Sequence, residues 1–440
     1  MLDNYILITF IFIFTIIVFF FLSGKNLRPK IIIDPYFFLY LTLGSMFSLH
    51  AWIFIFNDID TFFVSTYTLA FLFFAFGFGL SSKKYSDRLS LIFYNDSFNQ
   101  PYDVNNLFTN RAFTIAIFFG AILLYASILE GLYRLENLTS LYGANAAYLS
   151  ENNTARYFNY FKGSISIINI YLLIYVIYCS NKNFIKNTLV FIFFVMYIFS
   201  LMLAGSRSGL VTAFIVFGII VISDINNKKL SRRVFNIQLL IVLFAVVLAI
   251  IVTADALVSD YTSAAFTFLE RLLLNSDVGF RYHLAKYPIT LSQFESYDFT
   301  YYLKPYLTAL GLVERSEGIG PYMLVLSYID SPGKGPIPTF IYESYIVSKS
   351  SIYTIFYSFI LGFIIPVARY FSVIYFRSMI YSSSGKKFLI FVTFFSFGFG
   401  PTGDILNFQI SYLTMIFFTI VLYIMMFFKP FYILNKANDG

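Results

Sequence analysis

One short segment, Gly205-Ser206-Arg207-Ser208-Gly209, combines residue types that bind phosphate. The glycines permit backbone conformations that expose N–H groups, and a serine can cap a following helix, whose positive dipole end favours an anion. The planar fork of an arginine binds phosphate oxygens in pairs. We therefore interpret Arg207, with Ser206 and Ser208, as a diphosphate-binding site. The alternative is an arginine that extends to the membrane interface and caps the carbonyls of the preceding helix.

Arg281 and His283 form a second group, within the segment 275–285. Arg281 is a second cation for a diphosphate, or it forms an ion pair with Asp277, one helical turn away, or with Glu270. His283 has a side chain whose pKa suits a general base near neutral pH, or it is an amphipathic surface residue.

Glu343 is the second candidate base, in Ile-Pro-Thr-Phe-Ile-Tyr-Glu-Ser at 337–344. A carboxylate there could take a proton from a hydroxyl or pair with an arginine, or it could simply favour the start of a helix. The chain has one cysteine and two histidines, so we expect no zinc or haem site. It shows no nucleotide motif, so we expect no cofactor.

The elements that must position these residues are apolar runs. Hydrophobic residues make up 59% of the 440 residues and charged residues 12%, whereas soluble domains carry about 25% charge. A membrane-spanning helix needs roughly 20 mostly apolar residues. This pattern predicts an all-α polytopic membrane protein with about 11 (10–12) transmembrane helices. The runs lie at 5–22, 36–56, 62–80, 112–129, 164–180, 187–204, 209–223, 234–253, 351–368, 388–400 and 408–428.

The orientation follows from lysine and arginine, which gather in cytoplasmic loops. Of the 30 basic residues, 19 fall in one alternate set of connections, and 10 of the other 11 fall in two long loops, 130–163 and 254–350. We therefore expect a periplasmic N-terminus and a cytoplasmic C-terminus, and Arg207 in a short outer turn. The net charge of +7 then reflects topology rather than binding to nucleic acid.

The expected organisation has three parts. Residues 1–253 form the first eight transmembrane helices, with the outer loop 130–163. Residues 254–350 form a large extracytoplasmic loop that carries short helices, and residues 351–440 form the last three transmembrane helices and a cytoplasmic tail.

This layout resembles the O-antigen polymerases, or oligosaccharide repeat-unit polymerases. The resemblance rests on the Gly-Ser-Arg-Ser-Gly turn, on Arg281 in the long loop and on the segment 337–344. It covers nearly the whole chain in layout and about thirty residues in motifs. The related O-antigen ligases share the layout but carry a His-Gly pattern late in the loop, whereas Leu284 follows His283 here.

The resemblance implies a glycosyltransferase of the bacterial inner membrane. Its substrates would be undecaprenyl-diphosphate-linked oligosaccharides, which it would polymerise into O-antigen or capsule-type polysaccharide, with a chain-length regulator as a partner. Arg207 and Arg281 would take up the charge of the departing diphosphate, and His283 or Glu343 would activate the acceptor hydroxyl. The alternatives are an O-antigen ligase and a flippase or transporter of lipid-linked oligosaccharide. Few ionisable residues fall within the apolar runs, which disfavours transport.

Overall fold

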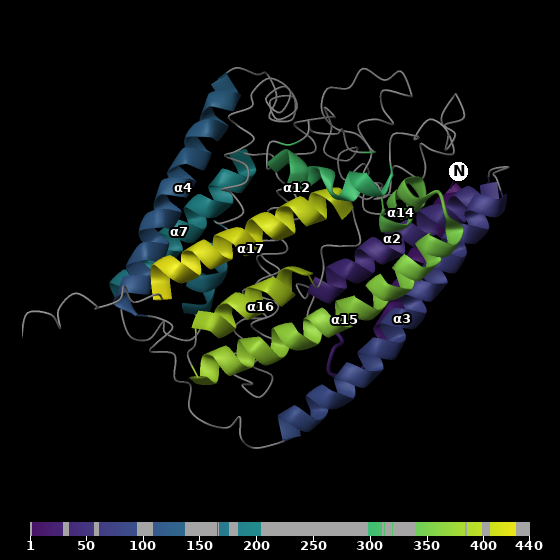
Figure 1. The fold of residues 1–440 in the computed structure, drawn as a ribbon, viewed down its shortest axis with the longest axis horizontal. Helices are drawn as coiled ribbons and strands as arrows, with labels where there is room; N and C mark the ends of the chain where they lie inside the picture. The colour runs from purple at the N-terminus through teal and green to yellow at the C-terminus, as the bar shows by residue number, and fades with distance from the viewer. Residues whose placement is uncertain are drawn as a thin grey trace, which may run out of the picture.

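The structure is a computed structural model that describes residues 2–29, 35–56, 61–94, 109–136, 165, 167–175, 184–203, 298–309, 312, 319, 339–382, 385–397 and 405–427. These residues form helices and their connections, without a strand. Figure 1 shows long helices packed beside one another, with short helices near one end of the bundle. The long helices are α1 (Leu2–Leu22), α2 (Pro35–Phe56), α3 (Thr61–Tyr94), α4 (Asn110–Glu136), α7 (Phe184–Leu203), α15 (Ser351–Ser382), α16 (Gly385–Phe397) and α17 (Ile405–Phe427). The short helices are the 3₁₀ helix η4 (Phe299–Tyr302), α12 (Lys304–Ala309) and α14 (Phe340–Ser348).

Local signals mark several helix ends. Helix α4 follows Thr109, whose Oγ1 accepts a hydrogen bond from the backbone N–H of Ala112 at 3.2 Å, as an N-cap does. Helix α2 begins with Pro35, which lacks the N–H that a first helical position leaves unused. Helix α14 ends where Lys349 adopts a left-handed conformation with φ 52°.

Helices α3 and α15 form the most extensive described contact and run parallel. The hydroxyls of Thr66 and Ser351 lie 2.9 Å apart at one end, and the rings of Tyr85 and Tyr370 lie 4.9 Å apart further along. Between these points two glycines allow the backbones to meet. A Cβ on Gly77 would lie 2.4 Å from the carbonyl oxygen of Phe359, and one on Gly362 would lie 2.2 Å from that of Phe74. Small residues of this kind let membrane helices approach closely.

The other neighbours fix the direction of the remaining helices. Helix α1 runs antiparallel to α2 and parallel to α3, and α4 runs parallel to α7. Helix α16 runs antiparallel to α15, since Lys387 donates to the carbonyl of Ser378 at 3.2 Å and the rings of Phe371 and Phe394 lie 4.9 Å apart. All these directions agree with the alternation that the sequence predicts.

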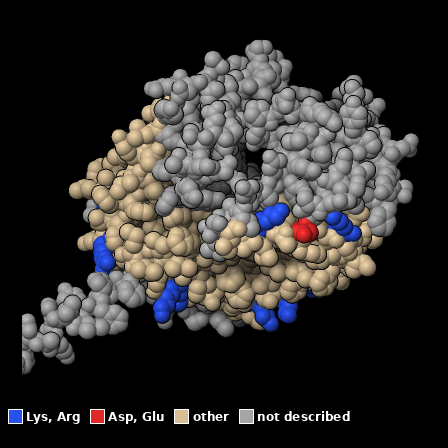
Figure 2. Space-filling view, turned by 45° about the horizontal axis from the view of Figure 1, so that its top comes forward, with Lys and Arg blue, Asp and Glu red and all other residues tan. Residues whose placement is uncertain are grey.

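As a consequence, many described basic residues lie at one end of the bundle, which we call the basic end. They follow the last turns of α1, lie in the C-terminal parts of α3 and α15, and lie in the first turns of α4, α7 and α16. They are Lys25, Arg28, Lys83, Lys84, Arg88, Arg111, Lys186, Arg377, Lys386 and Lys387. Figure 2 shows basic side chains along the lower edge of the described surface, and further basic side chains beside an acidic one near its upper edge.

Three described helical segments are long and apolar enough to cross a membrane: Ser65–Ile92, Asn110–Leu129 and Ser351–Met379. Shorter apolar segments lie in α1, α2, α7 and α17. Large apolar side chains point outward on several of these helices, among them Phe76 and Phe118, which are 58% and 68% exposed. Such outward apolar faces indicate a membrane-associated protein.

Two helices extend well beyond their apolar runs, so the expected loop after one of them is wrong. Helix α3 continues to Tyr94 and α15 continues to Ser382, well beyond the apolar runs that end at 80 and 368. Arg369 and Arg377 were therefore expected in a loop, but both are buried within α15. The physical reason is that the bundle continues past the apolar runs and buries one face of each extension, including Ser86 and Leu89.

Candidate functional site

Glu343 lies in α14, at the end of the bundle opposite the basic end. The helix follows Pro338 and begins after Thr339, whose carbonyl accepts a hydrogen bond from the N–H of Glu343 at 2.9 Å. Its side chains from Phe340 to Val347 are all buried, and Glu343 is 0% exposed. A carboxylate is rarely placed so deep without a partner or a function. Short helices were expected in residues 254–350, and α14 is one of them, with its side chains from Phe340 to Val347 enclosed.

On one side, α14 packs against α3 through aromatic rings. The ring of Tyr342 lies 4.8 Å from that of Tyr67, and the ring of Phe340 lies 5.1 Å from that of Phe74. Tyr67 in turn stacks on His50 of α2, with ring centres 3.8 Å apart and planes at 17°. This stack holds α14 against the ends of α2 and α3.

On another side lie η4 and the first turns of α15. Asp298 caps η4 by accepting a hydrogen bond from the N–H of Thr300 at 2.9 Å. Bonds from Thr300 lower the pKa of the Asp298 carboxyl, first through its hydroxyl and then through its backbone. Phe299 meets Tyr353 of α15 edge to face, at 5.0 Å.

The environment of Glu343 changes the pKa of Tyr302 in η4. Burial raises the pKa of the Tyr302 hydroxyl first, and the negative charge of Glu343 raises it further. The phenol therefore stays protonated and remains a hydrogen-bond donor at any physiological pH. The charge of Glu343 also acts on the Tyr357 hydroxyl of α15. We use the name tyrosine cluster for Tyr302 and Tyr357 together with Tyr301, which contacts Tyr302, and the pair Tyr67 and Tyr342.

A carboxylate and several phenols are chemically able to transfer a proton and to donate hydrogen bonds. An ionised Glu343 can accept a proton from a hydroxyl, and phenols combine an apolar face with a hydrogen-bonding tip. Because Glu343 is closed to solvent in this conformation, a substrate hydroxyl reaches it only when the surrounding side chains move.

The other predicted site residues, Arg207, Ser206, Ser208, Arg281 and His283, lie outside the described residues. The diphosphate site that they were expected to form therefore remains a prediction. Among the described residues, no three side chains of His, Cys, Asp and Glu come together as metal ligands would.

Arg369 is a residue that the sequence reasoning did not single out. It is 5% exposed within α15, and its Cζ lies 3.9 Å from the centre of the Tyr36 ring at the start of α2. A desolvated cation–π contact of this kind contributes about 2 kcal/mol. An arginine flanked on both sides by apolar helix was the available signal. The contact stabilises the packing of α2 against α15 and does not involve α14.

Comparison of the chain with protein-family models, with curated proteins and with solved structures found no match.

Proposed function

We propose that this protein is a membrane glycosyltransferase that polymerises undecaprenyl-diphosphate-linked oligosaccharide units on the periplasmic face of the bacterial inner membrane. The observation that carries the proposal is the buried Glu343 beside the tyrosine cluster, at the end of the bundle opposite the basic end. Residues 339–344, from the segment that contributes to the resemblance to O-antigen polymerases, belong to this part of the site.

The direction of the helices supports the orientation. Cytoplasmic loops carry an excess of lysine and arginine, so the basic end faces the cytoplasm in our proposal. Glu343 and the tyrosine cluster then face the periplasm, as does the N-terminus, and the C-terminus is cytoplasmic. Growing polysaccharide and lipid-linked units would meet on that outer side.

The proposed reaction needs a base and cations but no metal. The acceptor hydroxyl oxygen attacks the anomeric carbon of the donor chain, and the bond from that carbon to the diphosphate oxygen breaks. Undecaprenyl diphosphate leaves with the electron pair, while Arg207 and Arg281, with Ser206 and Ser208, bind its developing charge. The proton of the hydroxyl passes to Glu343 or to His283. Tyrosine faces of the cluster support sugar rings.

The test is a deletion of the gene, followed by electrophoresis of the surface polysaccharide. We expect the ladder of chain lengths to collapse to a single repeat unit, and the intact gene to restore it. Full-length polymer that accumulates on its lipid carrier would instead indicate a ligase. Repeat units that stay on the cytoplasmic side would indicate a flippase, and either outcome would overturn the proposal.

A further inference from the structure

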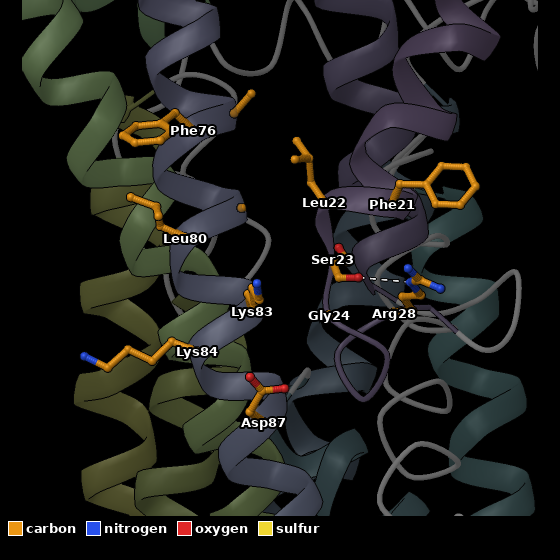
Figure 3. Close-up of a pocket in the computed structure, with 12 residues that line it drawn as sticks. Phe21, Leu22, Ser23, Gly24, Arg28, Phe76, Leu80, Lys83, Lys84 and Asp87 are labelled. Carbon is orange, nitrogen blue, oxygen red and sulfur yellow. Dashed lines mark hydrogen bonds between the residues drawn. The ribbon is translucent and has the colours of Figure 1, made fainter.

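A cavity of about 620 Å³ opens between α1 and α3, at the basic end and therefore far from Glu343. Figure 3 shows the C-terminal end of α1 and the turn after it on one side, and α3 on the other. Small-molecule sites in proteins typically enclose about 300–1,000 Å³, so this space is large enough for a lipid headgroup.

At the polar end of the cavity, the turn after α1 packs closely against α3 and hydrogen-bonds to it. A Cβ on Gly24 would lie 2.2 Å from Cβ of Ser86, so the turn after α1 rests directly on α3. The backbone N–H of Asn26 donates to Oγ of Ser86 at 3.1 Å, and the Asn26 side-chain amide donates to the carbonyl of Ser86 at 3.0 Å. The cavity is therefore a defined feature of how α1 and α3 pack.

Three cations and one carboxylate line this end: Arg28, Lys83, Lys84 and Asp87. The Nε of Arg28 donates to the carbonyl of Ser23 at 2.9 Å, which fixes the guanidinium and leaves its two terminal nitrogens as further donors. In Figure 3, Lys83 and Asp87 lie on the side of α3 near the gap, while Arg28 and Lys84 extend to either side of it. The net charge of the lining favours an anion.

The other end of the cavity is apolar and open to the surroundings. Phe21, Phe76 and Leu80 line it and are 68%, 58% and 48% exposed. Phe76 and Leu80 belong to the candidate membrane span Ser65–Ile92, so hydrocarbon chains of the bilayer can reach them. A ligand that satisfies both ends carries a negative headgroup on an apolar tail.

We propose that this cavity binds an anionic phospholipid of the leaflet at the basic end. The phosphate lies beside Lys83, with Arg28 and Lys84 on either side of the gap, and the upper acyl chains lie along Phe76 and Leu80. The inference rests on the cavity and its lining alone and holds whether or not the protein is a glycosyltransferase.

The test uses the purified full chain in detergent, titrated with phosphatidylglycerol and followed by native mass spectrometry. We expect the double variant Lys83→Ala/Lys84→Ala to bind about 25-fold more weakly, since each lysine near a bilayer surface contributes roughly a fivefold factor. Phosphatidylcholine and inorganic phosphate should bind weakly to both proteins, because one lacks the net charge and the other lacks the tail.

The matched control is Arg111→Ala/Lys386→Ala, which removes two exposed cations at the same end of the bundle but outside the cavity. It should bind phosphatidylglycerol as the unchanged protein does. A second variant, Gly79→Leu, fills the cavity beside Leu22 without a change in charge and should also weaken binding. Equal losses in the control, unchanged binding in both cavity variants, or equal affinity for inorganic phosphate would overturn the proposal. A change in oligomeric state without a change in lipid binding would assign the cavity to a second copy of the chain.

Discussion

At the scale of single residues, Glu343 differs in burial from a glutamate that only stabilises the start of a helix. A glutamate that only favours the helix dipole can remain exposed, whereas Glu343 is 0% exposed and raises the pKa of Tyr302. Enclosure in an apolar site is one way in which proteins prepare a carboxylate for proton transfer.

Glu343→Gln tests this role because it preserves the size of the side chain and removes the base. We expect the rate of chain elongation to fall by about 10²–10⁴-fold with protein abundance unchanged. Ser344→Ala is the control, since this neighbour is also buried and its hydroxyl only donates to the carbonyl of Ile341 at 3.0 Å. If His283→Ala, Glu343→Ala and the double variant all elongate at the normal rate, neither residue is the base.

Arg207 and Arg281 are tested by substitutions that separate charge from geometry. Lysine keeps the charge but lacks the planar fork, so Arg207→Lys should give shorter chains and Arg207→Ala only single repeat units. Arg281→Ala should reduce the rate by about a hundredfold or more, as loss of a donor to a developing anion does. The readouts are polysaccharide gels and binding of an undecaprenyl diphosphate analogue. Full-length polymer from Arg207→Ala would favour the arginine that caps the preceding helix.

At the scale of helices, apolar runs predicted some elements closely and others only in part. Helix α2 (Pro35–Phe56) coincides with the run 36–56, because Asp34 and Asp58 flank a mostly apolar stretch of sequence. Helices α3 and α15 extend past the ends of their apolar runs. Neighbouring helices stabilise these extensions, because they bury residues such as Ser86 and Arg369. Hydropathy alone does not contain that information. The motif at 337–344 singled out Glu343 as a candidate base, but its enclosure depends on tertiary contacts that hydropathy does not contain.

The close approach of α3 and α15 predicts a sharp difference between two neighbouring glycines. Gly77→Ala places a Cβ 2.4 Å from a backbone oxygen of Phe359, so the helices must separate. Gly79→Ala meets only the flexible end of Leu22, at 3.1 Å, and is the control. We expect Gly77→Ala to destabilise the protein by about 1–3 kcal/mol and Gly79→Ala by much less. Thermal unfolding in detergent measures both, and equal melting temperatures would contradict this packing.

At the scale of the whole molecule, the two ends of the bundle differ in chemistry. One end collects lysine and arginine, and the other encloses Glu343 among tyrosines. This polarity follows from the alternating directions of the helices, which the distribution of basic residues in the sequence already predicts.

Reporter fusions test the orientation directly. Fusions at Lys229 and Lys386 should report a cytoplasmic location, and fusions at Ser150 and Ser331 a periplasmic one. A periplasmic signal at Lys386 would place the basic end outside and Glu343 on the cytoplasmic side. The proposed reaction would then have no access to its substrates.

Reconstitution of the purified protein in vesicles with an undecaprenyl-diphosphate-linked oligosaccharide tests the central claim most directly. The lengths of the products and the release of undecaprenyl diphosphate are measured together. We expect products that grow by whole repeat units, with one undecaprenyl diphosphate released for each new linkage, and growth about 10²–10⁴-fold slower with Glu343→Gln. Substrate that crosses the vesicle membrane unchanged, or that is never joined to a second unit by the active protein, would contradict the claim.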